Sequence, residues 1–170
     1  MPSFLVVPGG SQRKFENAKK TAADALILDL EDSIAPDGKV GARRTVGEML
    51  DARNPVQRMY VRVNALDTDM TLGDLAAVMP GRPDGIVLPK CAGAADVNRL
   101  SLYLDAFEAA AGIEHGSTRI VTVATETARA VPKLLDSENM SPRLWGMMWG
   151  AEDLAAALGA SRHPTGHRVP

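Results

Sequence analysis

The sequence has a single cysteine, few aromatic residues and little net charge, and each of these shortages excludes a class of protein. Cys91 alone cannot form an internal disulfide or a multi-cysteine zinc site, which fits a reducing compartment. With two tryptophans, two tyrosines and three phenylalanines, the chain has few rings that could stack on nucleic-acid bases. A formal net charge of -2 gives no general attraction to nucleic acid or to anionic membranes.

Long hydrophobic runs are also missing. No apolar run approaches the ~18 residues that cross a membrane, and residues 1–4 lack the basic and then apolar layout of a signal peptide. We therefore expect a cytoplasmic protein with neither a membrane nor a nucleic acid as its partner. At 45% hydrophobic and 24% charged residues, the composition is that of an ordinary globular domain with a sizeable core.

Short apolar runs alternate with longer amphipathic ones along the chain. Several short runs are rich in Val, Ile and Leu on both faces, as parallel strands covered by helices are. They are Phe4–Val7, Ala25–Leu30, Met59–Val63, Gly85–Leu88, Arg119–Val123 and Leu144–Trp149. Apolar residues with helical spacing lie at Ser11–Ala23, Val46–Leu50, Leu72–Met79, Val97–Ala111, Ala128–Leu135 and Asp153–Leu158. Thr71 can cap the third of these helices, with Asp74 three residues on.

This series of about six βα units predicts an α/β fold with a parallel sheet. Two architectures stay open, an open doubly wound sheet and a (β/α)8 barrel, which typically needs about 250 residues. We expect one domain over residues 1–160 and a polar tail over residues 161–170. The bulky residues Trp145, Met147, Met148 and Trp149 are interpreted as sheet core, because a buried strand requires such side chains.

Nearly every predicted strand ends in polar residues. The carboxyl ends of parallel strands form the rim where such folds bind ligands, so we expect these residues to converge. They are Asp29, Glu31, Asp32, Arg62, Asn64, Lys90, Glu126, Glu152 and Asp153. Carboxylates without histidine or cysteine partners suit a hard cation such as Mg2+, with Glu126 and Asp153 as our first choice of ligands. Arg62 is placed to hold a substrate carboxylate or to stabilise an oxyanion, which predicts chemistry on a small oxo or hydroxy acid.

Other interpretations of these residues remain open. Asp29 and Glu31 equally fit structural ion pairs with the basic residues of the rim. Asp153 equally fits a cap on the helix that follows it. The turn at residues 8–11 could present backbone N–H groups to a phosphate, although it lacks the full spacing of a phosphate-binding loop.

Six short motifs follow one another along the chain. They are Val7-Pro8-Gly9 with Arg13-Lys14-Phe15, Leu28-Asp29-Leu30-Glu31-Asp32-Ser33, Val61-Arg62-Val63-Asn64, Leu88-Pro89-Lys90, Glu126-Thr127-Ala128-Arg129 and Gly150-Ala151-Glu152-Asp153-Leu154. Over residues 4–160, this series resembles the citrate lyase beta subunit-like branch of the HpcH/HpaI aldolase family, which includes malyl-CoA and citramalyl-CoA lyases. The resemblance implies a TIM (β/α)8-type barrel, here truncated after about six βα units.

The resemblance also implies a carbon–carbon lyase. Such enzymes use Mg2+, or Mn2+ in its place, to cleave a 3-hydroxy-acyl-CoA such as citryl-CoA or malyl-CoA to acetyl-CoA and an oxo acid such as oxaloacetate or glyoxylate. By motif, Glu126 and Asp153 would ligate the metal, and Glu126 would also face the substrate. Arg62 would bind the oxo acid and stabilise the enolate, with Asp32 beside the metal through water.

For coenzyme A, the resemblance implies binding by Pro8 and Gly9 together with Arg13 or Lys14. It further implies a homo-oligomer, either a trimer or a hexamer. Two alternative functions stay open. The first is a non-catalytic remnant or regulatory subunit that binds coenzyme A or an oxo acid without turnover, and the second is a metal-dependent aldolase acting on free hydroxy-oxo acids.

Overall fold

The computed structural model describes residues 2–126, 139–150, 159, 161–163 and 166–168. Six strands form one sheet, in which each strand pairs in parallel with the next one along the chain. They are β1 (Phe4–Pro8), β2 (Ala25–Asp29), β3 (Arg58–Arg62), β4 (Gly85–Leu88), β5 (Arg119–Val123) and β6 (Leu144–Met148). All six predicted strands are confirmed, and their ends differ from the prediction by no more than one residue.

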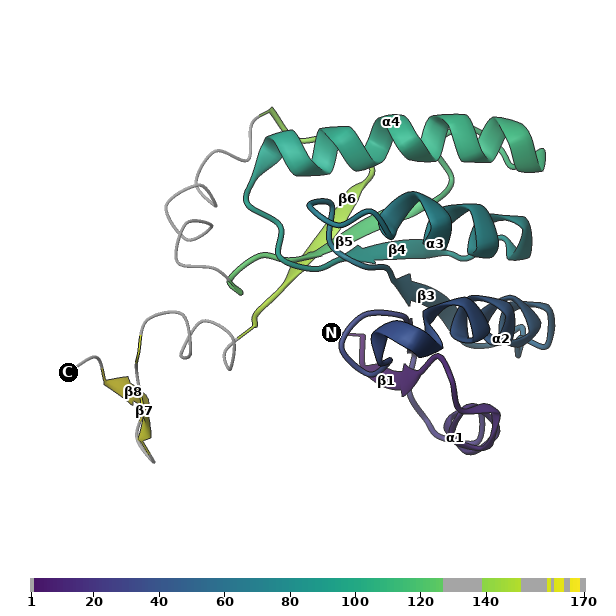
Figure 1. Ribbon diagram of the computed structural model, residues 1–170, viewed down its shortest axis with the longest axis horizontal. Helices are drawn as coiled ribbons and strands as arrows, with labels where there is room; N and C mark the ends of the chain where they lie inside the picture. The colour runs from purple at the N-terminus through teal and green to yellow at the C-terminus, as the bar shows by residue number, and fades with distance from the viewer. Residues whose placement is uncertain (1, 127–138, 151–158, 160, 164–165, 169–170) are drawn as a thin grey trace.

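Helices cover one face of this sheet, where α2, α3 and α4 lie side by side in Figure 1. The helices are α1 (Gln12–Ala18), α2 (Lys39–Asp51), α3 (Thr71–Val78) and α4 (Ala94–Ala111), with the 3-10 turns η1 (Pro36–Gly38) and η2 (Met79–Gly81). A doubly wound sheet reverses its strand order and carries helices on both faces, whereas a TIM barrel keeps the strands in sequence order with the helices outside. The α/β fold of TIM-barrel type is therefore confirmed, and the described residues supply six of its strands. The helices expected over residues 128–135 and 153–158 lie outside the described residues.

Strand alternation separates two apolar clusters on the two faces of the sheet. The larger cluster packs the helices against alternate strand residues such as Leu26, Leu28, Val61 and Leu88. The smaller cluster contains strand residues only, namely Ala25, Ile27, Tyr60, Val87, Val121 and Val123, with Phe4 and Met148 against them. This second face is the inner, concave side of the rolled sheet.

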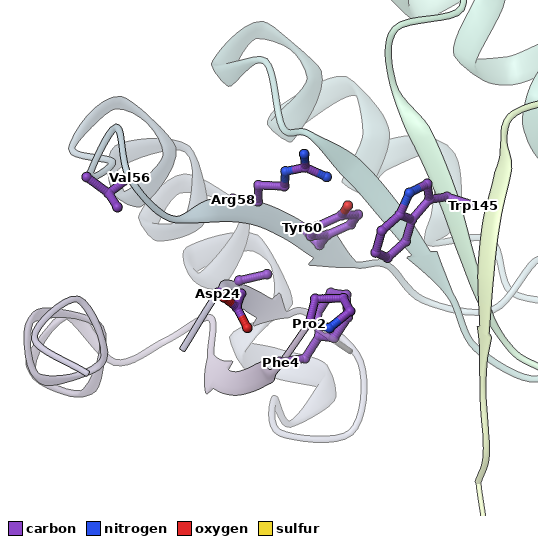
Figure 2. A pocket seen from close by; sticks show the side chains of 8 residues that line it. Pro2, Phe4, Asp24, Val56, Arg58, Tyr60 and Trp145 are labelled. Atoms are coloured by element: carbon purple, nitrogen blue, oxygen red, sulfur yellow. The ribbon is translucent and has the colours of Figure 1, made fainter. Parts of the chain in front are cut away.

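Aromatic rings show how far the sheet is rolled. Phe4 in β1 lies 5.4 Å from Tyr60 in β3 and 6.1 Å from Trp145 in β6, measured between ring centroids. Tyr60 and Trp145 are 6.2 Å apart, and all three rings line a cavity of about 330 Å³ at the amino ends of the strands (Figure 2). The first and the last strand of the sheet therefore approach each other at this end.

The residues of β6 correct the prediction that they form sheet core. Trp145, Met147 and Trp149 are 43%, 42% and 65% exposed. The physical reason is that β6 pairs only with β5 among the described strands, so its far side has no neighbour there. Met148 packs against the inner cluster, and the ring of Trp145 contacts Phe4 and Tyr60 while part of it stays exposed.

The start of α3 also differs from its prediction. Thr71 does not cap the helix, since its hydroxyl donates to the carbonyls of Asn64 at 3.1 Å and Ala65 at 2.7 Å. The Asp74 carboxylate accepts hydrogen bonds from the Asn64 backbone and side chain instead, each at 2.7 Å. Both side chains thus satisfy buried polar groups where the chain leaves β3, because leaving such groups unpaired costs more than an uncapped helix end.

The segment expected as a polar tail contains two short strands. β7 (Ser161–His163) and β8 (Gly166–Arg168) pair with each other in antiparallel fashion. Among the helices that the structure describes, none combines the length and the apolar character needed to cross a membrane.

Candidate active site at the carboxyl ends of the strands

Arg62 and Asp29 form the centre of the site. They end two neighbouring strands in register, and Arg62 donates from Nε to Asp29 Oδ1 at 2.7 Å and from Nη2 to Oδ2 at 2.9 Å. Asp29 is fully buried, and the amides of Glu31 and Ser33 donate to it as well. Burial alone would raise the pKa of Asp29, but its bonds from Arg62 and Ser33 prevail and hold that pKa below its ordinary value. Asp29 is therefore ionised, and it holds the Nε–Nη2 edge of the guanidinium group.

Glu31 lies beside this pair and is far less well compensated. Its carboxylate is 6% exposed and faces Lys90 Nζ at 2.9 Å and Arg62 Nη1 at 3.4 Å. Neither of its oxygens has a hydrogen-bond partner of regular geometry. Burial raises the pKa of Glu31 above its ordinary value, with a further contribution from the charge of Asp32, despite the opposing effect of Lys90.

Arg62 retains one nitrogen that Asp29 does not use. This atom, Nη1, points to Glu31 and to Asp32, whose Oδ2 lies 3.5 Å away on a side chain that is 57% exposed. Although burial alone would lower it, the pKa of Arg62 is raised by the hydrogen bonds and charge of Asp29. The guanidinium group is thus permanently charged and held rigidly by Asp29, and its remaining nitrogen faces Glu31 and Asp32.

Lys90 connects Glu31 to the end of β5. Its backbone is in the left-handed region at φ 51°, and its amide donates to Glu126 Oε2 at 2.5 Å while its ammonium faces Glu31. The carboxylate of Glu31 raises the pKa of Lys90, so the lysine remains protonated. Glu126 itself is buried, at 5% exposure. A non-glycine residue with positive φ is a strained arrangement of the kind that occurs at functional sites.

The end of β6 comes close to Glu126. The amide of Gly150 donates to Thr125 Oγ1 at 2.7 Å, and a Cβ atom at position 150 would lie only 2.5 Å from Glu126 Cγ. Only glycine allows this approach, which explains the first residue of the Gly-Ala-Glu-Asp motif. Asp153, the second predicted metal ligand, lies outside the described residues.

Two hollows flank these side chains. One, of about 470 Å³, is lined by acidic, basic and amide side chains of the rim, including Glu31, Asp32, Lys39, Asn64 and Lys90. The other, of about 490 Å³, lies between the turn after β1 and the start of α2 and is lined by Pro8, Gly10, Ser11, Ser33 and Thr45 among others. The site thus offers one charged hollow beside a less charged one.

The turn after β1 serves the fold in a way that the sequence did not indicate. The Gly9 amide donates to the Asp29 carbonyl at 2.9 Å, and a Cβ atom here would lie 2.7 Å from that carbonyl oxygen. Pro8 lines the second hollow, whereas Lys14 is exposed on α1 and is not among the lining residues. Arg62, Asp32 and Glu126 come together at the rim, while Lys14 stands apart from them.

The sequence left two interpretations open for the charged residues of the rim, structural ion pairs and ligand binding. The structure contains features of both. Asp29 pairs with Arg62 and Glu31 with Lys90, yet Arg62 keeps an outward edge. Lys39 was missed, although it is buried behind the rim. The sequence did contain a signal for the burial of Lys39, because this residue lies on the same helical face as Ala42, Val46 and Met49, which are all buried.

Comparisons with known proteins agree with this fold. The sequence profile of the HpcH/HpaI aldolase/citrate lyase family matches residues 3–170. Citrate lyase subunit beta of Escherichia coli K12 is 38% identical over 96% of this chain and 54% of its own length. A (3S)-malyl-CoA thioesterase of Cereibacter sphaeroides is 34% identical over 95% and 53%. An L-malyl-CoA/beta-methylmalyl-CoA lyase of Rhodobacter capsulatus is 37% identical over 91% and 49%.

A solved structure of a related protein has the same fold. The citrate lyase beta subunit of Mycobacterium tuberculosis, complexed with oxaloacetate and magnesium, superposes with a TM-score of 0.71 at 33% identity. The superposition covers 97% of this chain and 66% of that one. The chain spans about half of the length of the three relatives above. The family profile and these identities together show that the chain belongs to the HpcH/HpaI aldolase/citrate lyase family.

Proposed function

We propose that the protein is a Mg2+-dependent carbon–carbon lyase. Its substrate would be a 3-hydroxy-acyl-CoA of the citryl-CoA or malyl-CoA type, and its products acetyl-CoA and an oxo acid such as oxaloacetate or glyoxylate. The observation that carries the proposal is Nη1 of Arg62, a half-buried and permanently charged donor that Asp29 leaves unused and that faces the carboxylates of Glu31 and Asp32, which border the charged hollow. The names of the relatives support the same substrate class.

The donor set of the rim fits a hard cation. Glu126 is buried at a strand end, the buried Glu31 faces only the cations Lys90 and Arg62, and the described rim residues include no histidine. Glu126 and Asp153 would hold Mg2+, or Mn2+ in its place, with Asp32 beside it. When bound, the cation supplies polarisation of the oxo group and part of the charge that balances the rim.

Arg62 and its neighbours would perform the remaining work. Cleavage removes the proton of the substrate hydroxyl and breaks the adjacent carbon–carbon bond, whose electron pair passes into the enolate of the thioester. Return of one proton to the enolate carbon then gives acetyl-CoA. The outward edge of Arg62 is suited to hold the carboxylate of the oxo acid and to stabilise the negative charge that develops. Because Asp29 holds Nε and Nη2 of Arg62, this donor needs no reorganisation during the reaction.

Coenzyme A would lie over the second hollow. Pro8 lines this hollow, Gly9 follows it in the turn after β1, and the exposed ammonium of Lys14 would reach the phosphates from α1. We further propose that residues 1–160 form the lyase domain, that residues 161–170 are a separate tail, and that the protein works as a homo-oligomer, a trimer or a hexamer.

Replacement of Glu126 tests this function. In Glu126→Gln, Mg2+-dependent release of acetyl-CoA from citryl-CoA or malyl-CoA should fall by on the order of 100-fold or more, because a neutral amide is a weak ligand for a hard cation. Glu108→Gln is the matched control, since Glu108 is equally buried but pairs with Arg143 away from the rim. This control should retain the activity of each folded molecule. Unchanged cleavage in Glu126→Gln would refute the assignment.

A second reaction is favoured by one relative, the (3S)-malyl-CoA thioesterase. Hydrolysis of the thioester yields free coenzyme A and the intact acid, whereas carbon–carbon cleavage yields acetyl-CoA and an oxo acid. Chromatography of the products from malyl-CoA therefore separates the two reactions. Binding of the substrate without any product would instead indicate a non-catalytic subunit, and turnover of free hydroxy-oxo acids would indicate an aldolase.

A further inference from the structure

Lys39 is a buried amine directly behind the rim. It is the first residue of α2 and only 7% exposed. Lysine is almost never buried unless its charge is met, and a cation in the first turn opposes the helix dipole. Neither its burial nor its position at the start of a helix therefore favours a lysine here, so the groups that it contacts must explain the residue.

Each of its three donor protons has a partner. Lys39 Nζ donates to the carbonyl of Leu30 at 2.7 Å, to the carbonyl of Glu31 at 2.6 Å and to Asn64 Oδ1 at 2.8 Å. Leu30 and Glu31 follow β2, and Asn64 stands two residues after Arg62 at the end of β3. One ammonium group thus joins the ends of the two strands that carry the centre of the site.

The connection continues into the helices. Asn64 Nδ2 donates to Asp74 Oδ2 at 2.7 Å and to the Leu30 carbonyl at 3.2 Å, and Arg43 Nε donates to Asp74 Oδ1 at 2.8 Å. We call the residues Lys39, Arg43, Asn64 and Asp74 the buried brace. It links α2 and α3 to the carboxyl ends of β2 and β3.

The brace acts on the site through the backbone. At Glu31 the carbonyl accepts from Lys39, while the side chain reaches Lys90 and Arg62. The backbone of Glu31 is also held by its amide, which donates to Asp29. Lys39 therefore fixes the backbone from which the side chains of Glu31 and Asp32 extend toward Arg62, although it contacts none of these side chains.

We infer that Lys39 is a positioning residue of the proposed lyase reaction, which fixes Glu31 and Asp32 against Arg62; the inference rests on the proposed function. A compact ammonium suits this task, because its three donors diverge toward three acceptors on two chain segments. A planar guanidinium or a neutral side chain cannot reproduce that arrangement. A shift of about 1 Å in a catalytic group costs on the order of 100-fold in rate.

The test compares Lys39→Met with Arg43→Met in the full chain. Both substitutions remove a cation from α2 and from the same brace, but only Lys39 contacts the carbonyls of residues 30 and 31. Hydrogen exchange of the 29–34 segment should accelerate at least tenfold in Lys39→Met and less than threefold in Arg43→Met. In steady-state kinetics with malyl-CoA or citryl-CoA, kcat should fall 10- to 100-fold in Lys39→Met, with KM changed less than threefold. Arg43→Met should keep kcat within threefold.

The two readouts separate the two hypotheses. If the wild-type protein cleaves no CoA ester but exchange still accelerates in Lys39→Met alone, the proposed function fails and the role of Lys39 in fixing the rim stands. Equal exchange in both variants, or a loss of kcat in Arg43→Met as large as in Lys39→Met, would overturn the inference. Lys39→Arg supplies a further check, since full rescue of kcat would contradict the need for a three-way donor.

Discussion

Two clusters of charge in this molecule are each built around buried carboxylates and an arginine, and they differ in how completely their hydrogen bonds are satisfied. The rim cluster comprises Asp29, Glu31, Arg62 and Lys90. The outer cluster comprises Asp105 and Glu108 on α4 and Arg143 just ahead of β6. In the outer cluster Arg143 donates to Asp105 at 2.5 Å and to both oxygens of Glu108 at 2.8 and 2.6 Å.

In the outer cluster, the carboxylate of Glu108 has no free hydrogen-bonding position. Glu108 also accepts from the amides of Gly116 and Thr118, and although burial alone would raise it, these bonds and Arg143 lower the pKa of Glu108 to about 2. Atoms of Asp105, Glu108 and His115 lie within 4.8 Å of one another, close enough for a cation, but the charge of Arg143 already meets them. This cluster fastens α4 to β5 and β6.

In the rim cluster, the carboxylate of Asp29 is fully hydrogen-bonded, whereas that of Glu31 is not. Asp29 has four donors, whereas the oxygens of Glu31 face two cations without a regular hydrogen bond and border a hollow. A charge cluster that is saturated stabilises the fold, and one that keeps an open edge next to a cavity can bind a ligand. Satisfaction of the hydrogen bonds, rather than burial or charge, thus separates the two roles.

Removal of the two arginines should give the largest contrast. Arg62→Met should lower kcat/KM for the CoA ester by on the order of 10³-fold, as expected for loss of an oxyanion donor. Arg143→Met should lower the free energy of unfolding by about 3–5 kcal/mol, because it leaves buried carboxylates without their partner.

Urea denaturation and kcat/KM per folded molecule measure both effects. In Arg143→Met, the activity of each folded molecule should remain near that of the wild type. A comparable loss of activity in both variants would contradict the division between the clusters.

Replacement of the two glutamates should change stability in opposite directions. In Glu108→Gln, loss of charged hydrogen bonds should lower the free energy of unfolding by about 1–3 kcal/mol. Glu31→Gln should leave this free energy unchanged or raise it, because the raised pKa of Glu31 means that folding disfavours its ionised form. Only Glu31→Gln should reduce turnover. Chemical denaturation of both variants at pH 7 measures the sign, and destabilisation by Glu31→Gln as large as by Glu108→Gln would contradict it.

The strands could be predicted from sequence because each contains a short apolar run, as Gly85–Leu88 illustrates. Their polar ends could be placed at one rim because parallel strands share a direction. The sequential strand order could not be predicted from the βα pattern, which also fits a doubly wound sheet, and only the resemblance to the family indicated it. Exposure of β6 was missed for a related reason, because burial of Trp145 depends on which strands neighbour it.

Side-chain partnerships were the hardest part of the site to predict. The motif containing Arg62 indicated a substrate carboxylate, yet nothing local shows that Asp29 takes two of its three nitrogens. The choice between Lys90 and Arg62 as the partner of Glu31 likewise depends on strand register. Arg143 and Glu108, which are 35 positions apart, gave no local signal at all.

The smallest expected effect is a difference in how the two clusters respond to acid. Glu108 has an ordinary pKa of 4.5 that folding lowers to about 2, so in this window the unfolded chain takes up a proton while the folded protein does not. Its contribution to stability is complete above pH 4.5 and is lost as the pH falls toward 2. Glu31 has the opposite sign, because its raised pKa makes the folded protein bind the proton first, above pH 4.5.

Urea unfolding of the wild type and both glutamine variants between pH 7 and pH 2.5 resolves these contributions. The stability difference between the wild type and Glu108→Gln should be constant above about pH 5 and shrink steadily below it. The difference between Glu31→Gln and the wild type should shrink already as the pH approaches 4.5 from above. If the Glu108→Gln difference stayed constant down to pH 3, its carboxylate would not be held by Arg143 as the structure shows, and the contrast between a saturated and an open cluster would lose its basis.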